Sequence, residues 1–147
     1  LDGGWGVDAL LGRLSRSHND LDLILPLNDL ARAVDVLVRS GFEITEEELG
    51  RVVLEQADHG RIDLHPVRFD VHGNAMQVQP AESPLVYPSG GFVSGRILDR
   101  TVACISAGVQ VFTRLGYDRS QKHRQDALVL CAAFGLPVPE YWDEVLT

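Results

Sequence analysis

Apolar residues recur along the chain with two different periods, and the changes of period divide it into helices and strands. Five apolar side chains at helical spacing predict a first helix: Trp5, Val7, Leu10, Leu11 and Leu14. An apolar run at 21–26 predicts a buried strand. Asn28 is a suitable N-cap for a second helix that extends to Ser40, and Gly41 ends it. The chain therefore opens with a helix, a strand and a second helix.

The middle of the chain is predicted to be mainly β-structure. Runs rich in β-branched and apolar residues indicate short strands at 42–45, 51–57 and 61–69. The acidic run 46–48 and the pair His59-Gly60 are the predicted turns between them. Alternation at 74–80 indicates an exposed strand, and the stretch 81–91, rich in proline, serine and glycine, indicates a long loop.

The rest of the chain is predicted to form one hairpin and a helical part. The hairpin has strands at 92–98 and 101–105. Helices follow at 106–115 and 119–134, and the tail 139–147 is expected to form a capping helix. The predicted fold class is α+β, with a mixed sheet, flanking helices and a short C-terminal helical part.

Composition and charge narrow the class of protein. A chain of 147 residues, 45% of them hydrophobic, has room for one domain with its own core. The formal net charge of -8 argues against a general nucleic-acid binder and suits a cationic small substrate. No apolar run approaches the length that crosses a bilayer. Cys104 and Cys131 lie in apolar segments without zinc-ligand spacing, so we expect core thiols in a cytoplasmic protein.

Asp20 and Asp22 stand at the start of the strand predicted at 21–26. Residues two apart on a strand point to the same face, so these two carboxylates can hold one metal ion between them. Mg²⁺ suits such a site because it is a hard cation that takes oxygen ligands. An Asp-x-Asp pair also occurs by chance in acidic proteins, and Asn19-Asp20 can equally be a turn that leads into the strand.

Asp63 is the candidate for a third carboxylate. It lies between Ile62 and Leu64, so it faces away from the core, on the same side as His65. If its strand lies beside 21–26, Asp63 joins Asp20 and Asp22 and either shares a metal ion or takes the proton from an attacking hydroxyl. Asp70, at a predicted strand end, is the second choice for this role. His65 itself is either a ligand, a base or a structural histidine held by a hydrogen bond.

Glycines and basic residues near these carboxylates can bind phosphate. Gly3 and Gly4 leave backbone amides open to an anion, and the helix that follows adds partial positive charge. Arg16 lies between this helix and the strand, where it is either a phosphate ligand or a solvated cation. Lys122 and Asp126 are one helical turn apart and can simply pair on the surface.

Three stretches together resemble a known family. The wording GGWGVDALLGR, followed by an arginine, a histidine and DLDL, is similar to the small antibiotic adenylyltransferases of the lincosamide and aminoglycoside-2'' type. GRIDLHPV and the C-terminal helix continue the resemblance over most of the chain. It implies the nucleotidyltransferase fold, shared with DNA polymerase β, with a core at 1–105 and a helical segment at 106–147 on the same domain. The family completes its first strand near Leu1, so we expect an upstream helix and strand to be absent here.

The resemblance also implies an activity. It is transfer of AMP from ATP, with Mg²⁺, to a hydroxyl of a small antibiotic. Asp20, Asp22 and Asp63 are the implied metal ligands, with Asp63 also as base. Gly3, Gly4, Arg16 and Lys122 are the implied nucleotide ligands. Related enzymes often pair, so a homodimer is possible. Two alternatives stay open: a toxin-type nucleotidyltransferase that modifies protein or RNA, and a nucleotide-binding module without turnover.

Overall fold

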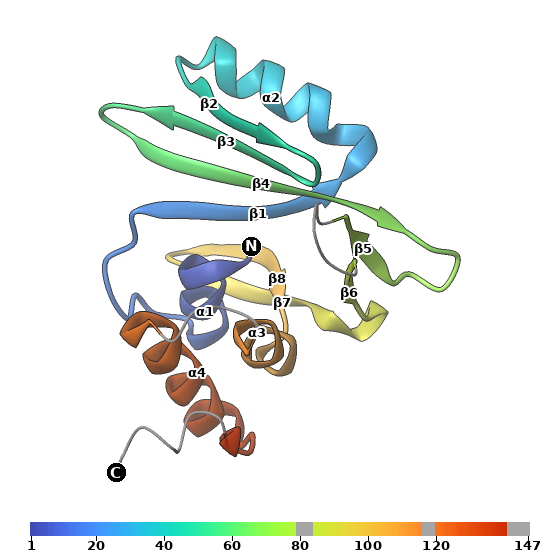
Figure 1. Ribbon diagram of the computed structural model, residues 1–147. Coiled ribbons are helices and arrows are strands. Elements are labelled where there is room, and N and C mark those ends of the chain that lie inside the picture. The colour runs from blue at the N-terminus through green and yellow to red at the C-terminus, as the bar shows by residue number, and fades with distance from the viewer. Residues whose placement is uncertain (79–83, 116–119, 141–147) are drawn as a thin grey trace.

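The fold is a mixed sheet with helices on both faces (Figure 1). The computed structural model describes residues 1–78, 84–115 and 120–140. The predicted α+β class is confirmed. Residues 141–147 of the predicted capping helix lie outside the described residues.

The central strand of the sheet is β4 (Gly60–Phe69), the longest strand described. It pairs in parallel with β1 (Asp20–Pro26) and antiparallel with β3 (Arg51–Gln56), to which β2 (Glu43–Glu48) is added. The C-terminal end of β4 pairs with β5 (Ala75–Gln77), and β5 pairs with β6 (Leu85–Tyr87). A separate hairpin consists of β7 (Phe92–Ile97) and β8 (Arg100–Ile105).

Two layers cover the sheet (Figure 1). On one face lies α2 (Leu30–Arg39), preceded by a 3₁₀ turn (Leu27–Asp29). On the other lie α1 (Gly3–Leu11), the β7–β8 hairpin, α3 (Ala107–Arg114) and α4 (Gln121–Phe134). A second 3₁₀ turn (Ser89–Gly91) leads into the hairpin. None of the helices in the described ranges is long and apolar enough to cross a membrane.

The faces of β1 differ in polarity, as its alternation predicts. Leu21, Leu23 and Leu25 pack with α2 and with the apolar side chains of β3 and β4. Asp20 and Asp22, which alternate with Leu21 and Leu23, project from the opposite face. The sequence pattern thus predicts correctly which side of this strand is available for chemistry.

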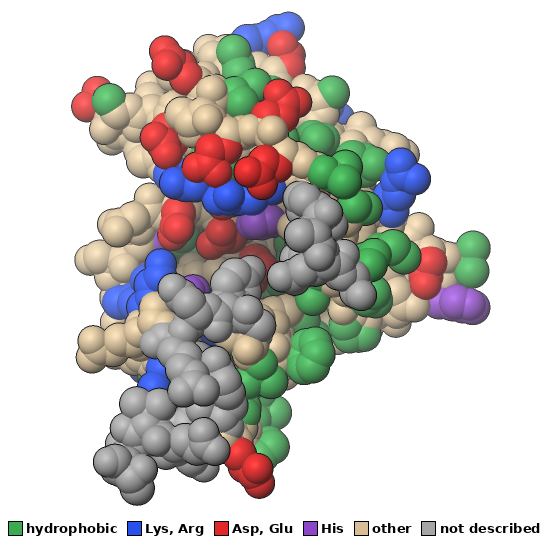
Figure 2. Space-filling model, viewed as in Figure 1, with side chains coloured by type: hydrophobic (Ala, Val, Ile, Leu, Met, Phe, Trp, Pro, Cys, Tyr) green, Lys and Arg blue, Asp and Glu red, His purple; other side chains and the backbone are tan. Residues whose placement is uncertain are grey.

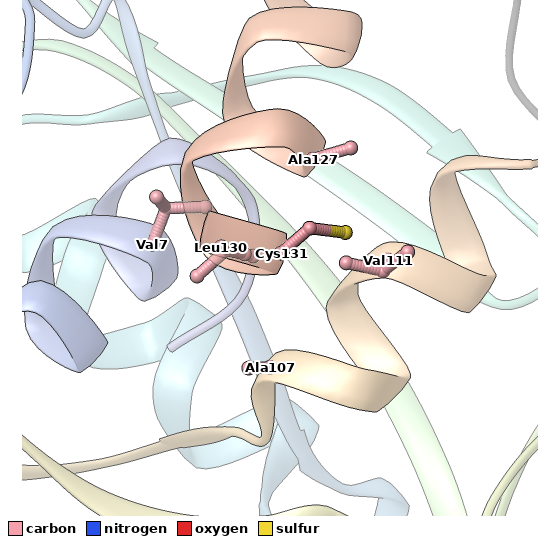
Figure 3. Packing of buried hydrophobic residues seen from close by; sticks show 6 residues of the cluster. All are labelled: Val7, Ala107, Val111, Ala127, Leu130 and Cys131. Atoms are coloured by element: carbon pink, nitrogen blue, oxygen red, sulfur yellow. The ribbon is translucent and has the colours of Figure 1, made fainter. Parts of the chain in front are cut away.

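A second core holds the helices together. Figure 3 shows its six buried members, which come from α1, α3 and α4 and point toward one another: Val7, Ala107, Val111, Ala127, Leu130 and Cys131. Because α1 carries the glycines and α4 carries Lys122 and Asp126, this core sets the position of two walls of the functional site.

Several local predictions are wrong. The acidic run 46–48 belongs to β2 rather than to a turn, because Glu46 forms ion pairs with Arg51 and Arg61 across the strands. The predicted loop 81–91 contains β6, in which Tyr87 is buried. The first helix ends at Leu11, since Gly12 adopts the left-handed C-cap conformation.

Two further expectations fail at the ends of elements. Leu14 is 55% exposed and lies outside the first helix, so it is not part of the apolar stripe. The N-cap position of the second helix is Asp29 rather than Asn28, because a 3₁₀ turn precedes the helix, and the Asp29 side chain makes no capping hydrogen bond. Cys104 and Cys131 are buried and unpaired, as the sequence predicts.

Candidate functional site

A cavity of about 590 Å³ lies between the polar face of β1 and β4 and the helices α1, α3 and α4. Figure 2 shows acidic and histidine side chains gathered in a hollow on this side of the molecule. The cavity is lined by every residue that the sequence predicts for the site: Gly3, Gly4, Arg16, Asp20, Asp22, Asp63 and Lys122. Residues more than a hundred positions apart in the sequence thus meet at one place.

The parallel pairing of β1 with β4 places Asp22 directly opposite Asp63. Ligand atoms of Asp22, Asp63 and His65 lie within 4.8 Å of one another, which is close enough for one cation. Asp20 lines the same cavity but is not a member of this close group. The structure therefore brings two of the three predicted carboxylates together, adds a histidine, and leaves Asp20 nearby.

Asp63 is held by an arginine that the sequence interpretation missed. The Arg51 Nε lies 3.0 Å from both carboxylate oxygens of Asp63, and its Nη2 lies 2.7 Å from Oδ2. Arg51 also donates to Glu46 at 2.9 Å. Hydrogen bonding to Asp63 raises the pKa of Arg51. Arg51 is two residues from Val53, the partner of Asp63 in β3, so strand alternation would have placed it diagonally across from Asp63.

His65 lies between the two carboxylates. Its Nε2 is 3.6 Å from Asp22 Oδ1 and 3.5 Å from Asp63 Oδ1. Its Nδ1 is 3.0 Å from the amide nitrogen of Gln77. Burial lowers the pKa of His65, but the hydrogen bond with Asp22 and the charge of Asp63 outweigh burial and raise it overall. Gln77 was not predicted, because a glutamine in an apparently exposed strand carries no signal of a buried role.

The first turn of α1 forms another wall of the cavity. Gly3 and Gly4 lie inside this turn rather than before it, and Asp2 is the N-cap. A Cβ on Gly3 would lie 1.9 Å from Oδ2 of Asp22, and one on Gly4 would lie 2.3 Å from Nδ1 of His18. Neither position has room for a side chain, and at Gly3 the helix backbone closely approaches the carboxylate of Asp22. Burial raises the pKa of Asp2, which also lines the cavity.

The opposite wall carries a buried cluster of charges. Asp126 of α4 accepts hydrogen bonds from Arg16 at 3.0 and 2.8 Å and lies 3.5 Å from Nη2 of Arg114. Burial opposes ionisation of Asp126, but Arg16 and Arg114 together lower its pKa. Asp126 is buried and points inward, so it is not available for the surface pair with Lys122 that the helical spacing allowed. Arg114 was missed because an arginine in the last turn of a helix usually reads as a solvated cation.

A small polar cluster supports the loop that carries Arg16. Asp8 is fully buried in α1 and accepts hydrogen bonds from the backbone and the hydroxyl of Ser15. It also lies 2.6 Å from Nε2 of His18, whose ring packs against Trp5. These contacts join α1 to the loop that leads into β1, and so fix Arg16 relative to the glycines.

Asp70, the second choice for the third carboxylate, lies outside the cavity. It accepts hydrogen bonds from the backbone of His72 and Asn74 in an exposed turn between β4 and β5. The side chain of Asn74 also donates to it and lowers its pKa. Asp70 is thus a turn residue, and Asp63 is the carboxylate that faces Asp22.

Solved structures identify the class of protein to which this fold and site belong. The lincomycin-bound structure of the lincosamide antibiotic adenylyltransferase LnuA matches with a TM-score of 0.78 and 29% identity, over 88% of this chain and 82% of that one. ANT(2'')-Ia in complex with adenylyl-2''-tobramycin matches with a TM-score of 0.71 and 25% identity, over 91% and 78% of the two chains. The class is that of the antibiotic nucleotidyltransferases.

Sequence comparison gives the family. A lincosamide resistance protein of Staphylococcus haemolyticus is 30% identical over 127 residues, which are 86% of this chain and 79% of that protein. A 2''-aminoglycoside nucleotidyltransferase of Escherichia coli is 38% identical over 60 residues, 41% of this chain and 29% of that protein. The family model for aminoglycoside-2''-adenylyltransferase matches residues 1–130. The chain belongs to this adenylyltransferase family, as the resemblance in its sequence predicts.

Proposed function

We propose that the protein transfers AMP from ATP to a hydroxyl of a lincosamide antibiotic, with Mg²⁺ as cofactor. The register of β1 and β4 carries the proposal, because it sets Asp22 beside Asp63 in a cavity next to the N-terminus of α1. A lincosamide is favoured because the relative named for lincosamide resistance aligns along 86% of this chain. An aminoglycoside is the second candidate, supported by the family model over residues 1–130.

The donor atoms fit a hard cation. Asp22 and Asp63 offer carboxylate oxygens within 4.8 Å of each other, and Asp20 lines the same cavity. Asp20 and Asp22 would hold Mg²⁺, and Asp63 would complete the cluster. When bound, the cation neutralises charge on the phosphate oxygens. The absence of a side chain at Gly3 leaves the space that Oδ2 of Asp22 occupies beside the helix backbone.

The cations around the cavity suit a triphosphate. Arg16, Lys122 and Arg114 line the same cavity as Gly3 and Gly4, in the first turn of α1. A helix N-terminus favours an anion, but the Gly3 amide already donates to the side chain of Asp2. The buried Nε of Arg114 has no hydrogen-bond partner among the described residues, so a phosphate oxygen would satisfy it. Arg16 and Arg114 are already aligned by Asp126, which reduces the entropy lost when the nucleotide binds.

Asp63 is the residue that meets the acceptor. Its carboxylate would accept the hydrogen bond of the antibiotic hydroxyl and take its proton as the oxygen attacks the α-phosphorus. The pairing with Arg51 fixes the direction in which this carboxylate faces. In-line attack depends mostly on such positioning and on neutralised charge, and it needs no protein nucleophile.

Pyrophosphate release tests the proposal. The protein, ATP and Mg²⁺ are incubated with lincomycin, with tobramycin, or with neither. Release that depends on lincomycin supports the lincosamide assignment, and release with tobramycin alone replaces it by the aminoglycoside one. Asp22→Asn is expected to lower the rate of pyrophosphate release at least 100-fold with the fold intact. Asp35→Asn, on the exposed face of α2, is the control and is expected to release pyrophosphate at the wild-type rate.

Two other outcomes separate the remaining alternatives. ATP binding without release for any antibiotic would favour a nucleotide-binding module. Label transferred from α-labelled ATP to protein or RNA, with no antibiotic present, would favour a toxin-type enzyme. Either result would contradict the proposed function.

A further inference from the structure

The position of His65 is compatible with two roles, that of a metal ligand and that of a hydrogen-bond donor to the carboxylates. Its Nε2 is 3.5–3.6 Å from one oxygen each of Asp22 and Asp63. Two ligands about 2.1 Å from a tetrahedral metal lie about 3.4 Å apart, so these separations alone allow an imidazole ligand. The position of the proton on the ring decides between a ligand and a hydrogen-bond donor, because a nitrogen that carries hydrogen has no lone pair for a metal.

The hydrogen bonds behind the ring begin at the backbone of Gly50. Its carbonyl oxygen lies 3.1 Å from Nε2 of Gln77 and can only accept. The Gln77 Oε1 accepts from the hydroxyl of Tyr87, also at 3.1 Å. An inverted amide would place two acceptor oxygens, those of Gly50 and Gln77, against each other. Gln77 is 7% exposed, so this repulsion would lie in a buried site and the amide is held in one orientation.

The orientation of Gln77 determines the tautomer of His65. The second hydrogen of the Gln77 amide faces Nδ1 of His65 at 3.0 Å, so Nδ1 is an acceptor. A neutral imidazole with Nδ1 as acceptor carries its proton on Nε2. A charged imidazolium would carry a proton on Nδ1 too, directed against the amide hydrogens of Gln77, so these hydrogen bonds select the neutral ring. The nitrogen that faces Asp22 and Asp63 then bears the hydrogen.

We propose that His65 is a positioning residue for the carboxylate pair, with its Nε2–H directed between Asp22 and Asp63, and that Gln77 prevents it from coordinating the cation. Histidines that bind metals usually donate their second ring N–H to an acceptor, which is the opposite arrangement. The cation site then has oxygen ligands from the protein. It favours Mg²⁺ and Mn²⁺ over Zn²⁺ and Ni²⁺, for which imidazole is a suitable ligand.

This inference rests on the proposed function only in that a divalent cation binds near Asp22. The first test needs neither metal nor substrate. In wild-type protein labelled with ¹⁵N-histidine, the long-range ¹H–¹⁵N correlation pattern of the His65 ring is expected to be that of a ring with its proton on Nε2. A pattern with the proton on Nδ1 alone would overturn the proposal.

The second test uses Mn²⁺ alone and pulsed electron paramagnetic resonance. The wild-type spectrum is expected to lack nitrogen modulation from a histidine ligand. His65→Asn should bind Mn²⁺ as tightly as wild type, while Asp22→Asn should bind it much more weakly. Nitrogen modulation in wild type, or an equal loss of affinity in His65→Asn and Asp22→Asn, would contradict the proposal.

Gln77→Glu reverses the hydrogen bond behind the ring. A carboxylate accepts from Nδ1–H, which leaves Nε2 with a free lone pair. Affinity for Zn²⁺ or Ni²⁺ is expected to increase roughly 10- to 100-fold. The same substitution at Gln56, at the far end of β3, is the matched control and should leave the affinity for Zn²⁺ and Ni²⁺ unchanged. If Gln77→Glu does not fold, the histidine correlation pattern and the Mn²⁺ spectrum of the wild-type protein still decide whether His65 is a ligand.

The outcomes distinguish this inference from the proposed function. A protein that releases no pyrophosphate with any antibiotic, but has the proton on Nε2 and no nitrogen modulation, would refute the function and support the inference. An enzyme that releases pyrophosphate with an antibiotic but binds Mn²⁺ through His65 would support the function and refute the inference.

For the active enzyme, a kinetic measurement separates positioning from simple structural support. His65→Asn is expected to lower kcat while the KM for ATP stays near the wild-type value, because the carboxylates lose their orientation but the phosphate ligands are unchanged. A rise in the KM for ATP with kcat unchanged would contradict a positioning role.

Discussion

Asp126 pairs with two arginines, Arg16 and Arg114, that are distant in the sequence. Its replacement by asparagine tests how much these pairs stabilise the fold. Asparagine keeps the shape of the side chain and one acceptor oxygen but removes the charge. Arg114, whose side chain is 4% exposed, then keeps its charge in a buried site. Arg16 is 26% exposed and can be hydrated in part.

Removing one partner of a buried ion pair costs about 3–5 kcal/mol. Because Arg16 can reach water and asparagine still accepts a hydrogen bond, we expect the lower end of this range, about 3 kcal/mol. The matched control is Asp35→Asn. Asp35 pairs with Arg39 at 3.0 Å, but the two side chains are 55% and 78% exposed, so the expected loss is about 0.3–0.5 kcal/mol.

Equilibrium unfolding in urea, followed by far-ultraviolet circular dichroism, measures both variants. The midpoint of Asp126→Asn should fall well below that of Asp35→Asn, with the same dependence on urea concentration. If both variants lose the same small amount of stability, the buried charge cluster does not stabilise the fold and the reasoning is wrong.

The stability that Asp126→Asn loses relative to wild type is expected to depend on pH. The pKa of Asp126 is lower in the folded protein than its ordinary value of 3.8. A group with a lowered folded-state pKa contributes stability above its unfolded-state pKa and loses it as the pH falls through the folded-state value. The difference in stability between wild type and Asp126→Asn should therefore be largest at neutral pH and shrink below pH 3.8, which acid titrations of both proteins would measure. A difference that grows in acid would contradict the assignment.

Three further substitutions have expected outcomes. Gly3→Ala should abolish turnover because its Cβ would lie 1.9 Å from Oδ2 of Asp22, whereas Gly12→Ala, with nothing within 4 Å, should cost only about 1–2 kcal/mol of backbone strain and retain activity in the pyrophosphate assay. Leu54→Ala should lower the free energy of unfolding by about 2–5 kcal/mol, since Leu54 is fully buried, and a loss under 1 kcal/mol would show that the core relaxes around it. Leu98→Asn should stabilise the protein or leave it unchanged in thermal unfolding, because Leu98 has a φ of 51° that asparagine tolerates better; a lower melting temperature would contradict this.

The sequence predicted the acidic residues of the site because their signal is local. Asp20 and Asp22 alternate with leucines, and Asp63 lies between two apolar residues, so strand periodicity alone gives their face. That Asp63 belongs opposite Asp22 needed the further assumption that the two strands are neighbours. The parallel register of β1 and β4 now supplies it.

The residues that the sequence did not predict depend on contacts between distant elements. In the sequence, Arg114 and Asp126 have the positions of ordinary helix-surface charges. In the structure α3 and α4 pack against α1, and both side chains are buried. Gln77 lies in a segment whose alternation suggested an exposed strand, yet Ala75 and Gln77 are its buried side chains. Periodicity reports which residues share a face, but tertiary packing decides which face is covered.

Val7 packs in the same cluster as Ala127 and Leu130, and this has a consequence for biosynthesis. The ribosome makes α1 more than a hundred residues before it makes these partners in α4. While the intervening sheet emerges, the apolar side of α1 has no native contact from that helix, and Arg16 has no Asp126. The cavity therefore reaches its final shape only after translation of α4, so the two walls are completed late in folding.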